Sequence, residues 1–358
     1  MTPPLHIPVQ YNTNSFLPKV DFANLEFGKY MADHMMVSKY ADQTWKPAEI
    51  VPYGPITMMP TALALHYGQS VFEGMKAFRM SDGNISIFRI KKHYDRLART
   101  LTRMCMPVMP YELFEEGLKQ LVAVDQAWVP STEGSSLYIR PLVFATEDRF
   151  GVKISDEYSF IIMTGPVPPF YPKPLRVKIE DRYSRAAKGG TGAAKCAGNY
   201  GGAFYASKIA KEEGFDQVLW TDLSTDLKIE ESGTMNAFFL IDNTLITPPV
   251  SETILEGVTR DSVLAICRRD GIPVEERPIT AAELKAAHAA GKLKEAFGTG
   301  TAAVTAAIST IGLKGELMEL PPYTSESICM QLQQKMTAIK KGDAPDTFGW
   351  NTVLQVAK

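Results

Sequence analysis

Proline is concentrated in one stretch of this chain, and that stretch divides the chain in two. Residues 166–174 read Pro-Val-Pro-Pro-Phe-Tyr-Pro-Lys-Pro, so five of these nine residues are proline. Proline fixes φ and lacks an amide hydrogen, which makes such a stretch a stiff, extended connector. A length of 358 residues is also enough for about two domains. The sequence therefore predicts an N-terminal domain over 1–166, a connector over 167–174 and a C-terminal domain over 175–358.

Composition and charge exclude several classes of protein. With 45% hydrophobic residues the chain can bury large cores, and 38 Lys and Arg against 40 Asp and Glu leave a formal charge of −2. A chain this close to neutral has no general attraction for nucleic acid or an anionic membrane, so any anionic ligand must bind at a local site. No apolar run approaches the roughly 20 residues that span a bilayer, and the N-terminus shows no targeting pattern. The cysteines, which have no metal-ligand spacing, suit a reducing cytoplasm; they are Cys105, Cys196, Cys267 and Cys329.

Side-chain periodicity predicts strands and helices in both parts, and therefore a mixed α/β fold. Asp242 and Asn243 lie between two short apolar runs and predict a hairpin turn. Strands are predicted over 84–89, 137–145, 158–165, 175–180, 217–220, 237–241 and 244–247. Helices are predicted over 91–104, 111–124, 199–213, 263–269, 281–294 and 326–340.

One lysine lies in a run of small residues that contains no acid. Lys195 follows Gly-Gly-Thr-Gly-Ala-Ala and precedes Cys-Ala-Gly-Asn-Tyr. Partly desolvated and without a carboxylate beside it, this ammonium should have a lowered pKa and supply a free amine for a Schiff base. A solvated lysine in an ordinary flexible loop is the alternative. A Walker loop is excluded because Ala194 and Cys196 stand where that motif has Gly and Ser or Thr.

Three other places offer groups for an anionic or aromatic ligand. Glu231 follows another acid between hydrophobic strands, where one carboxylate could point inward. Glycine-led turns at 257–260 and 298–301 present backbone N–H groups, the first at the start of a helix. Arg96 could bind a phosphate through two N–H groups. Each group alone is equally well explained by an ordinary turn or a solvated side chain.

Tyr138 and Arg140 lie two residues apart in an apolar strand and therefore share a face. An arginine turned into such a strand's buried face would have to meet a carboxylate, and an outward-facing arginine is the alternative. The stretch 65–79 interleaves aromatic residues with glycine, which can form either a pocket wall or a packed core junction.

These groups together match what pyridoxal 5′-phosphate requires. The cofactor needs an amine for its aldehyde, an acid facing its ring nitrogen, and N–H and guanidinium donors for its phosphate. The acid keeps the ring nitrogen protonated, so that the ring can absorb electrons. The lysine, once an amino acid has displaced it, becomes the base that moves the α-proton.

Seven ordered motifs across nearly the whole chain resemble one family, the branched-chain amino acid aminotransferases. These are fold-type IV pyridoxal-phosphate enzymes, and the likeness is to their longer subgroup. The motifs are Phe27-Gly28-Lys29, Tyr67 to Phe78, Leu137 to Pro141, Lys195 to Tyr200, Glu231 to Asn236, Gly257 to Arg260 and Gly298 to Ala302. The resemblance implies a small domain of sheet and helices and a larger domain with a barrel-like sheet, with the cofactor between them.

The resemblance also implies a role for individual residues at the cofactor. Lys195 would form the Schiff base, Glu231 would face the pyridine nitrogen, and Tyr200 would hydrogen-bond the phenolic oxygen. The other cofactor contacts would come from Arg96, Leu255, Gly257, Val258, Thr259 and Thr301.

Substrate contacts follow from the same resemblance. Thr234 and the backbone at Ala302 would hold the substrate α-carboxylate, and Arg140 would meet the distal carboxylate of glutamate. The apolar pocket would be walled by Phe27, Tyr67, Phe72 and Tyr138. In the family, Tyr67 and the loop near Phe150 and Val152 reach the neighbouring subunit's site, which implies a homodimer.

The expected activity is reversible, ping-pong amino transfer between L-Leu, L-Ile or L-Val and 2-oxoglutarate. A D-amino acid aminotransferase or an aminodeoxychorismate lyase would use the same lysine. A cofactor-free binding protein of this fold is an alternative from a different class.

Overall fold

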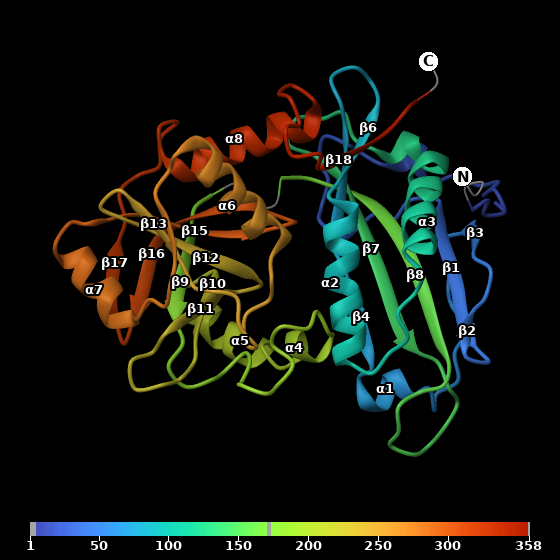
Figure 1. The fold of residues 1–358 in the computed structure, drawn as a ribbon, viewed down its shortest axis with the longest axis horizontal. Helices are drawn as coiled ribbons and strands as arrows, with labels where there is room; N and C mark the ends of the chain where they lie inside the picture. The colour runs from blue at the N-terminus through green and yellow to red at the C-terminus, as the bar shows by residue number, and fades with distance from the viewer. Residues whose placement is uncertain (1–4, 170–172, 357–358) are drawn as a thin grey trace. The chain divides into compact units, whose positions relative to one another are not determined.

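The computed structural model describes residues 5–169 and 173–356 and groups the chain into two compact units (Figure 1). The first unit comprises residues 1–170, 194–198 and 338–358, and the second comprises 171–193 and 199–337. The predicted connector lies partly outside the described residues. Two segments of the predicted C-terminal domain group with the first unit because of their strand pairings. Cys196 bridges Val71 in β4 (Ser70–Phe72), and β18 (Asn351–Leu354) pairs with β6 (Ile85–Phe88).

The first unit is built on one sheet, which among the described residues has nine strands. Their order is β18-β6-β5-β7-β8-β1-β2, with β3 beside β1 and β4 beside β7. Central strands β7 and β8 pair along their whole length from Ser136 to Ala145, and both are largely buried, as their apolar runs predict. The remaining bounds are β1 His34–Ala41, β2 Thr44–Trp45, β3 Glu49–Pro52, β5 Met75–Arg79, β7 Ser136–Ala145 and β8 Tyr158–Val167.

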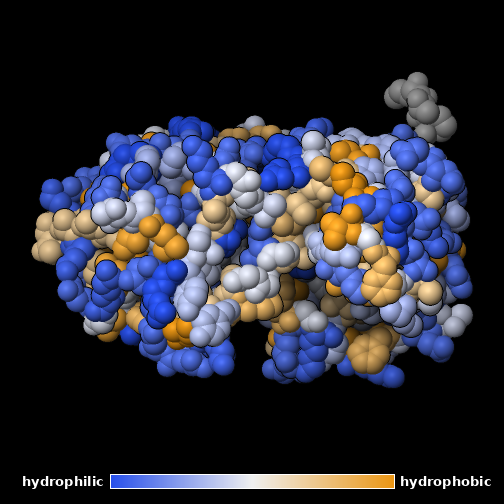
Figure 2. Space-filling model, turned by 90° about the horizontal axis from the view of Figure 1, so that it is seen from below, coloured by the Kyte–Doolittle hydropathy of each residue, from blue (hydrophilic) through white to orange (hydrophobic). Residues whose placement is uncertain are grey.

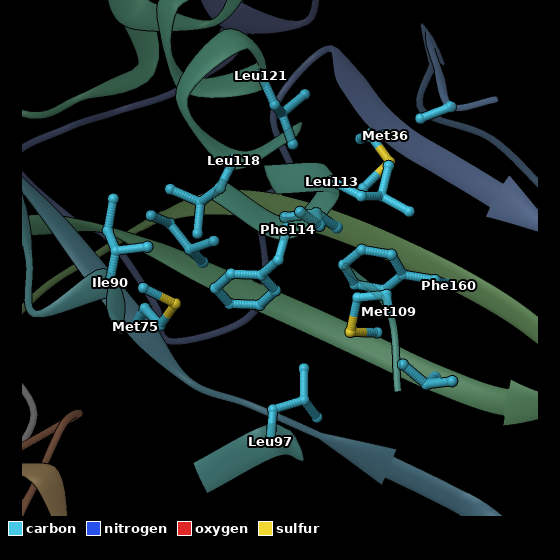
Figure 3. Packing of buried hydrophobic residues seen from close by; sticks show 14 of the residues in the cluster. Met36, Met75, Ile90, Leu97, Met109, Leu113, Phe114, Leu118, Leu121 and Phe160 are labelled. Atoms are coloured by element: carbon cyan, nitrogen blue, oxygen red, sulfur yellow. The ribbon is translucent and has the colours of Figure 1, made fainter. Parts of the chain in front are cut away.

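Three helices accompany this sheet: α1 (Leu63–Tyr67), α2 (Ile90–Arg103) and α3 (Tyr111–Val124). The predicted helices 91–104 and 111–124 are confirmed within one residue. Their apolar faces pack onto the sheet in one core, and Figure 3 shows Phe114 of α3 directed at Phe160 of β8. The two rings are stacked, with centroids 6.2 Å apart and planes 9° from parallel. This packing fixes α2, which carries Arg96.

The second unit contains a closed barrel of six strands. Order β11-β10-β9-β16-β15-β12 is closed by a pairing of β11 with β12, which confirms the expected barrel-like sheet. Phe238 and Phe297, opposite each other on β12 and β15, stack with centroids 5.2 Å apart. The bounds are β9 Leu175–Ile179, β10 Gln217–Thr221, β11 Ile229–Ser232, β12 Met235–Ile241, β13 Thr244–Thr247, β14 Val274–Glu276, β15 Leu293–Gly300, β16 Val304–Leu313 and β17 Glu316–Glu319.

The helices of the second half differ from the predictions in three places. The predicted helix 199–213 is divided into α4 (Gly198–Gly201) and α5 (Phe204–Glu212), since two consecutive glycines at 201 and 202 weaken a helix interior. α6 (Val258–Asp270) begins five residues earlier than predicted because its first turn is buried. α7 (Ala281–Ala289) ends early, since Gly291 takes a left-handed φ of 67° before β15 begins. α8 (Ile328–Lys341) ends the helical set.

None of the helices in the described ranges is long and apolar enough to cross a membrane. Figure 2 shows one face of the molecule, on which hydrophilic residues surround small groups of hydrophobic ones.

Candidate active site

Lys195 lies in a hydrogen-bonded segment of the first unit and not in a loose loop. Its backbone N–H donates to Oγ1 of Thr100 at 3.1 Å, and its carbonyl oxygen accepts from the N–H of Phe72 at 3.1 Å. Ala197 N–H donates to the carbonyl oxygen of Ser70, which extends the pairing along β4. The lysine is half-buried, and its Nζ lies 4.8 Å from the centroid of the Phe72 ring. The backbone therefore holds the amine on the edge of the sheet, above one aromatic face.

Arg140 lies against the same aromatic residue. Its guanidinium is 4.6 Å from the centroid of Phe72 and 5.2 Å from that of Tyr138, and its Nη2 donates to the Tyr138 hydroxyl at 3.1 Å. This confirms that Tyr138 and Arg140 share a face. It also shows that Arg140 is turned inward, since its Nε is buried and has no hydrogen-bond partner among the described residues.

A cavity of about 320 Å³ opens beside this arginine, and Phe27, Tyr138, Arg140 and Thr164 help to line it. Phe27 packs edge-on against Tyr138 with ring centroids 5.2 Å apart. Gly74 is required for the wall, because a Cβ there would lie 2.1 Å from the Tyr138 hydroxyl oxygen. Residues 65–79 are not among those that line this cavity, so the aromatic and glycine stretch is packed behind Tyr138 and Arg140 at this point. An aliphatic group would fit against the rings, and a carboxylate would meet the guanidinium.

Arg96 is buried in an ion pair, so the solvated alternative is wrong. Its Nε and Nη2 donate to the two oxygens of Glu73 at 2.7 Å each, and Nδ1 of His93 lies 2.9 Å from Oε2 of Glu73. Burial alone would raise the pKa of Glu73, but the Arg96 charge and these hydrogen bonds lower it. Burial also lowers the pKa of His93, against the opposing effect of Glu73. Glu73 thus fixes the orientation of Arg96 on α2.

In the second unit, Glu231 is buried on β11 and held from two sides. Its Oε1 accepts from the backbone N–H of Leu255 at 2.7 Å and from Nδ2 of Asn236 at 3.4 Å. Nε of Arg185 lies 2.9 Å from Oε2, an ion-pair distance whose angle does not make a hydrogen bond. The amide and the guanidinium both stabilise a negative charge on this carboxylate.

Asn236 gathers several of the predicted residues around Glu231. Its Nδ2 also donates to the carbonyl oxygen of Leu255 at 2.9 Å, and a Cβ on Gly257 would lie 1.9 Å from its Oδ1. Only glycine therefore permits α6 to begin where it does. Residues Val258 and Thr259 form the first turn of that helix, and its N-cap has no side-chain cap hydrogen bond.

Two turns lie at one edge of the barrel. Thr234 is in the turn between β11 and β12, while Thr301 and Ala302 are in the turn between β15 and β16. The start of β12 pairs with the end of β15 through Asn236 and Thr299, which brings the two turns to the same edge. Tyr200 lies half-buried in α4.

The chain matches known proteins over most of its length. A family model described as "Amino-transferase class IV" matches residues 70–311. Branched-chain-amino-acid aminotransferase 2 of Bacillus subtilis is 44% identical over 344 residues, which is 95% of each chain. The Mycolicibacterium smegmatis branched-chain-amino-acid aminotransferase is 41% identical over 359 residues, covering 97% of this chain and 98% of the relative. The chain belongs to the class IV aminotransferases.

This aminotransferase is also similar to a solved structure of the same family. The T.th. branched-chain amino acid aminotransferase, complexed with N-(5′-phosphopyridoxyl)-L-glutamate, has a TM-score of 0.69 and 26% identity. The match covers 88% of this chain and 97% of that one. Class IV aminotransferases of this fold use pyridoxal 5′-phosphate as cofactor.

The residues of this aminotransferase fit that cofactor. Glu231 is a buried carboxylate supported by an amide and a guanidinium, as an acid facing a pyridine nitrogen must be. The first turn of α6, a helix of 13 residues, begins at a glycine and lacks a side-chain cap, which suits a phosphate. Lys195 has the primary amine that the aldehyde of the cofactor requires.

Six of the predicted substrate residues are not among those that line the cavity beside Arg140: Tyr67, Phe72, Phe150, Val152, Thr234 and Ala302. Tyr67 is 44% exposed, Phe150 is 79% exposed and Val152 is 82% exposed. The ring of Phe150 contacts His66, with centroids 5.9 Å apart. Tyr67, Phe150 and Val152 are therefore open to solvent in the single chain.

The sequence analysis did not predict a role for four side chains of the site: Glu73, His93, Arg185 and Asn236. Glu73 and Asn236 lie inside two of the seven motifs. A buried Arg96 would need an acidic partner, and that requirement could have pointed to Glu73. Nothing near Arg185 in the sequence indicates that it contacts Glu231 on β11. The two residues are 46 positions apart, and only the folded barrel brings them together.

Proposed function

We propose that this aminotransferase moves an amino group reversibly between L-Leu, L-Ile or L-Val and 2-oxoglutarate. The relatives that match over nearly the whole chain are named branched-chain-amino-acid aminotransferases, and that favours this activity over a D-amino acid aminotransferase or an aminodeoxychorismate lyase. The donor leaves as its 2-oxo acid before the acceptor enters, so the kinetics are ping-pong.

The observation that carries the proposal is the inward-facing guanidinium of Arg140 in an aromatic cavity. The rings of Phe27, Phe72 and Tyr138 offer an apolar surface to a branched side chain. Arg140 is half-buried and its buried Nε has no partner among the described residues, and a polar group taken out of water is costly unless it is paired. A glutamate carboxylate would supply that partner, so one cavity can accept both classes of substrate.

At the cofactor, Nζ of Lys195 is the nitrogen that carries pyridoxal phosphate at rest. The cofactor supplies an aldehyde carbon that accepts an amine and a ring that accepts electrons. Once the substrate nitrogen had replaced it, Nζ would take the proton from the substrate α-carbon and pass it to the carbon that had carried the cofactor's aldehyde, and it would move the proton the opposite way when the acceptor reacts. Glu231 faces the ring nitrogen, and Tyr200 donates a hydrogen bond to the phenolic oxygen.

Phosphate and carboxylate groups are held by the remaining residues. Arg96, the backbone of Val258 and Thr259, and Thr301 bind the phosphate, with Leu255 and Gly257 completing this wall. Glu73 binds Nε and Nη2 of Arg96 and so fixes the orientation of the guanidinium that would face the phosphate. Thr234 and the backbone of Ala302 bind the substrate α-carboxylate. Most of these contacts fall in the predicted C-terminal domain, 175–358.

We further infer a homodimer in which Tyr67, Phe150 and Val152 contact a second copy of the chain. Exposed apolar side chains of this size are stabilised by a partner surface. A cytoplasmic location is proposed as well, because all four cysteines are free thiols.

A substrate panel tests the proposed activity. Purified protein with pyridoxal phosphate is assayed with L-leucine, L-isoleucine, L-valine, D-alanine and aminodeoxychorismate, with 2-oxoglutarate as acceptor for the amino donors. We expect turnover of the three branched substrates only. Turnover confined to D-alanine or aminodeoxychorismate would assign the chain to a different activity. Protein that stays colourless with the cofactor would point to a binding protein.

A further inference from the structure

A second cavity, of about 430 Å³, lies within the second unit and takes no part in the proposed chemistry. It is lined by β11 residue Glu230, by Lys188 and Lys228, and by apolar side chains that include Pro248, Pro249 and Ile254. Its volume lies within the range of small-molecule sites, about 300–1,000 Å³. Successive residues of a strand point to opposite faces, so Glu230 points away from the face that carries Glu231. The cavity is therefore separate from the candidate active site.

Glu230 is the polar group at the base of this cavity. It is 4% exposed, and its Oε1 accepts a hydrogen bond from Oγ1 of Thr253. Because the Thr253 hydrogen is used there, the 3.0 Å contact between Ser251 Oγ and Thr253 Oγ1 has Ser251 as donor. The other oxygen, Oε2, is buried and has no hydrogen-bond partner among the described residues. The Thr253 hydroxyl thus serves Oε1, the Ser251 hydroxyl supports Thr253, and Oε2 is left for a donor outside the chain.

Burial raises the pKa of Glu230, against the opposing effects of Thr253 and the Arg185 charge. A buried carboxylate oxygen without a donor is costly, and an ammonium is the group that would satisfy it best. Lys188 and Lys228 are exposed and line the same cavity, and so do the exposed carboxylates of Asp222 and Glu252. The outer part of the cavity therefore carries both signs of charge and can meet the carboxylate of a ligand through the two lysines. Between these polar groups the wall is formed largely by proline and isoleucine side chains.

We propose that this cavity binds a small aliphatic α-amino acid as a zwitterion. Its ammonium donates to Oε2 of Glu230, its side chain packs on Pro248, Pro249 and Ile254, and its carboxylate faces Lys188 and Lys228. The proposal does not depend on the transaminase activity, because it uses a separate face of β11.

Binding of 1-aminocyclopentane-1-carboxylate to the holoenzyme tests the proposal. This amino acid has no α-hydrogen, so turnover cannot consume it, and calorimetry can count the sites that it fills. We expect Glu230→Gln to weaken binding at the cavity by at least about tenfold. Asp226→Asn, an exposed acid on the same connection that does not line the cavity, should leave binding unchanged. A crystal soaked with the compound should show it at Glu230.

Two further measurements separate the halves of the ligand. Cyclopentanecarboxylate, which lacks the ammonium, should bind at least about tenfold more weakly than the amino acid. Lys188→Gln with Lys228→Gln changes exposed residues only, so the protein should fold, and binding should weaken severalfold. Equal binding by wild type and Glu230→Gln, equal binding of the carboxylate, or a soaked crystal with no compound at Glu230 would overturn the proposal. The substrate panel above fails or succeeds independently of these results.

Discussion

At the residue scale, the charged side chains of the candidate site differ in whether an opposite charge pairs with them. Arg96 is bound by Glu73, and Glu231 is contacted by Arg185. Arg140 instead rests on two aromatic rings and donates only to a tyrosine hydroxyl among the hydrogen bonds that the structure describes. In the proposed function, a substrate carboxylate would supply the pairing that this guanidinium lacks.

Replacing Arg140 by Ala should therefore separate the two substrate classes. We expect kcat/KM for glutamate to fall by about 100-fold, the value of a buried charge-assisted hydrogen bond. For leucine, which uses only the apolar wall, the loss should stay below about tenfold. Steady-state kinetics with both donors measures the two losses. Arg140→Lys is the control, because it keeps the positive charge and removes the paired N–H donors of the guanidinium. Equal losses for the two donors would contradict the dual role of the cavity.

How much of the site the sequence predicts depends on the distance over which its residues interact. The shared face of Tyr138 and Arg140 follows from a two-residue strand period, and the structure confirms it. The pairing of Arg96 with Glu73 joins residues 23 positions apart on a helix and a loop, so no local pattern indicates it. Asn236 contacts Leu255 and Gly257 only because the barrel brings these residues together, so no local pattern predicts those contacts either.

At the element scale, local sequence signals set the boundary of a helix or strand where nearby residues form the cap or the turn that ends it. Thr280 caps α7: its Oγ1 accepts from the N–H of Glu283 at 3.1 Å. The hairpin predicted at Asp242 and Asn243 is confirmed, with β12 ending at 241 and β13 starting at 244. Closure of the barrel by β11 and β12 was not predictable, since strand periodicity does not specify partners.

Thr280→Ala should lower the free energy of unfolding by about 1 kcal/mol, the usual value of an N-cap side chain. Thr225→Ala is the matched control, because Thr225 is exposed and caps no helix. Guanidinium denaturation of the three proteins measures the difference. The same shift in both variants would show that the cap hydrogen bond is not its cause.

The end of α8 carries a buried lysine that makes stability depend on pH. Nζ of Lys340 lies 4.8 Å from the Phe88 ring and 5.4 Å from the Phe78 ring. Burial, with the charge of Lys76, lowers the pKa of Lys340 to about 7 from 10.5. The unfolded chain thus binds more protons between pH 7 and 10.5, so the free energy of unfolding should rise with pH across that window, by up to about 1.4 kcal/mol per pH unit.

Lys340→Met should reduce this rise, since it removes one of two buried lysines that titrate in this window; the other is Lys76, whose pKa burial lowers to about 8. Lys341→Met, one residue further along, is the control and should keep the wild-type slope. Denaturation midpoints at a series of pH values between 7 and 10 provide the measurement. A wild-type slope in Lys340→Met would contradict the assignment.

At the scale of the whole molecule, two segments of the C-terminal half group with the first unit. The proline-rich connector predicts a single division, but the chain returns to the first unit at residues 194–198 and again at 338–358. The first return holds Lys195 beside β4, and the second adds β18 to the sheet. A division read from proline content alone misses both returns, because each depends on strand pairing with distant residues.

We expect a substitution at one surface residue to change the oligomeric state of the protein. Phe150→Asp places a charge on a side chain that is 79% exposed, and it should shift the protein from dimer to monomer. Leu317→Asp on β17, where the leucine is 48% exposed, is the control and should remain dimeric. Light scattering distinguishes the two states. A wild-type protein that is monomeric, or a Phe150→Asp variant that stays dimeric, would contradict the proposed interface.

The central claim is that Lys195 holds the cofactor, and one measurement tests it most directly. The holoenzyme is treated with borohydride, which makes a Schiff-base bond permanent, and the digested chain is searched for a phosphopyridoxyl group by mass spectrometry. The account predicts the label on Lys195 alone. A label on another lysine, or none on any, would contradict it.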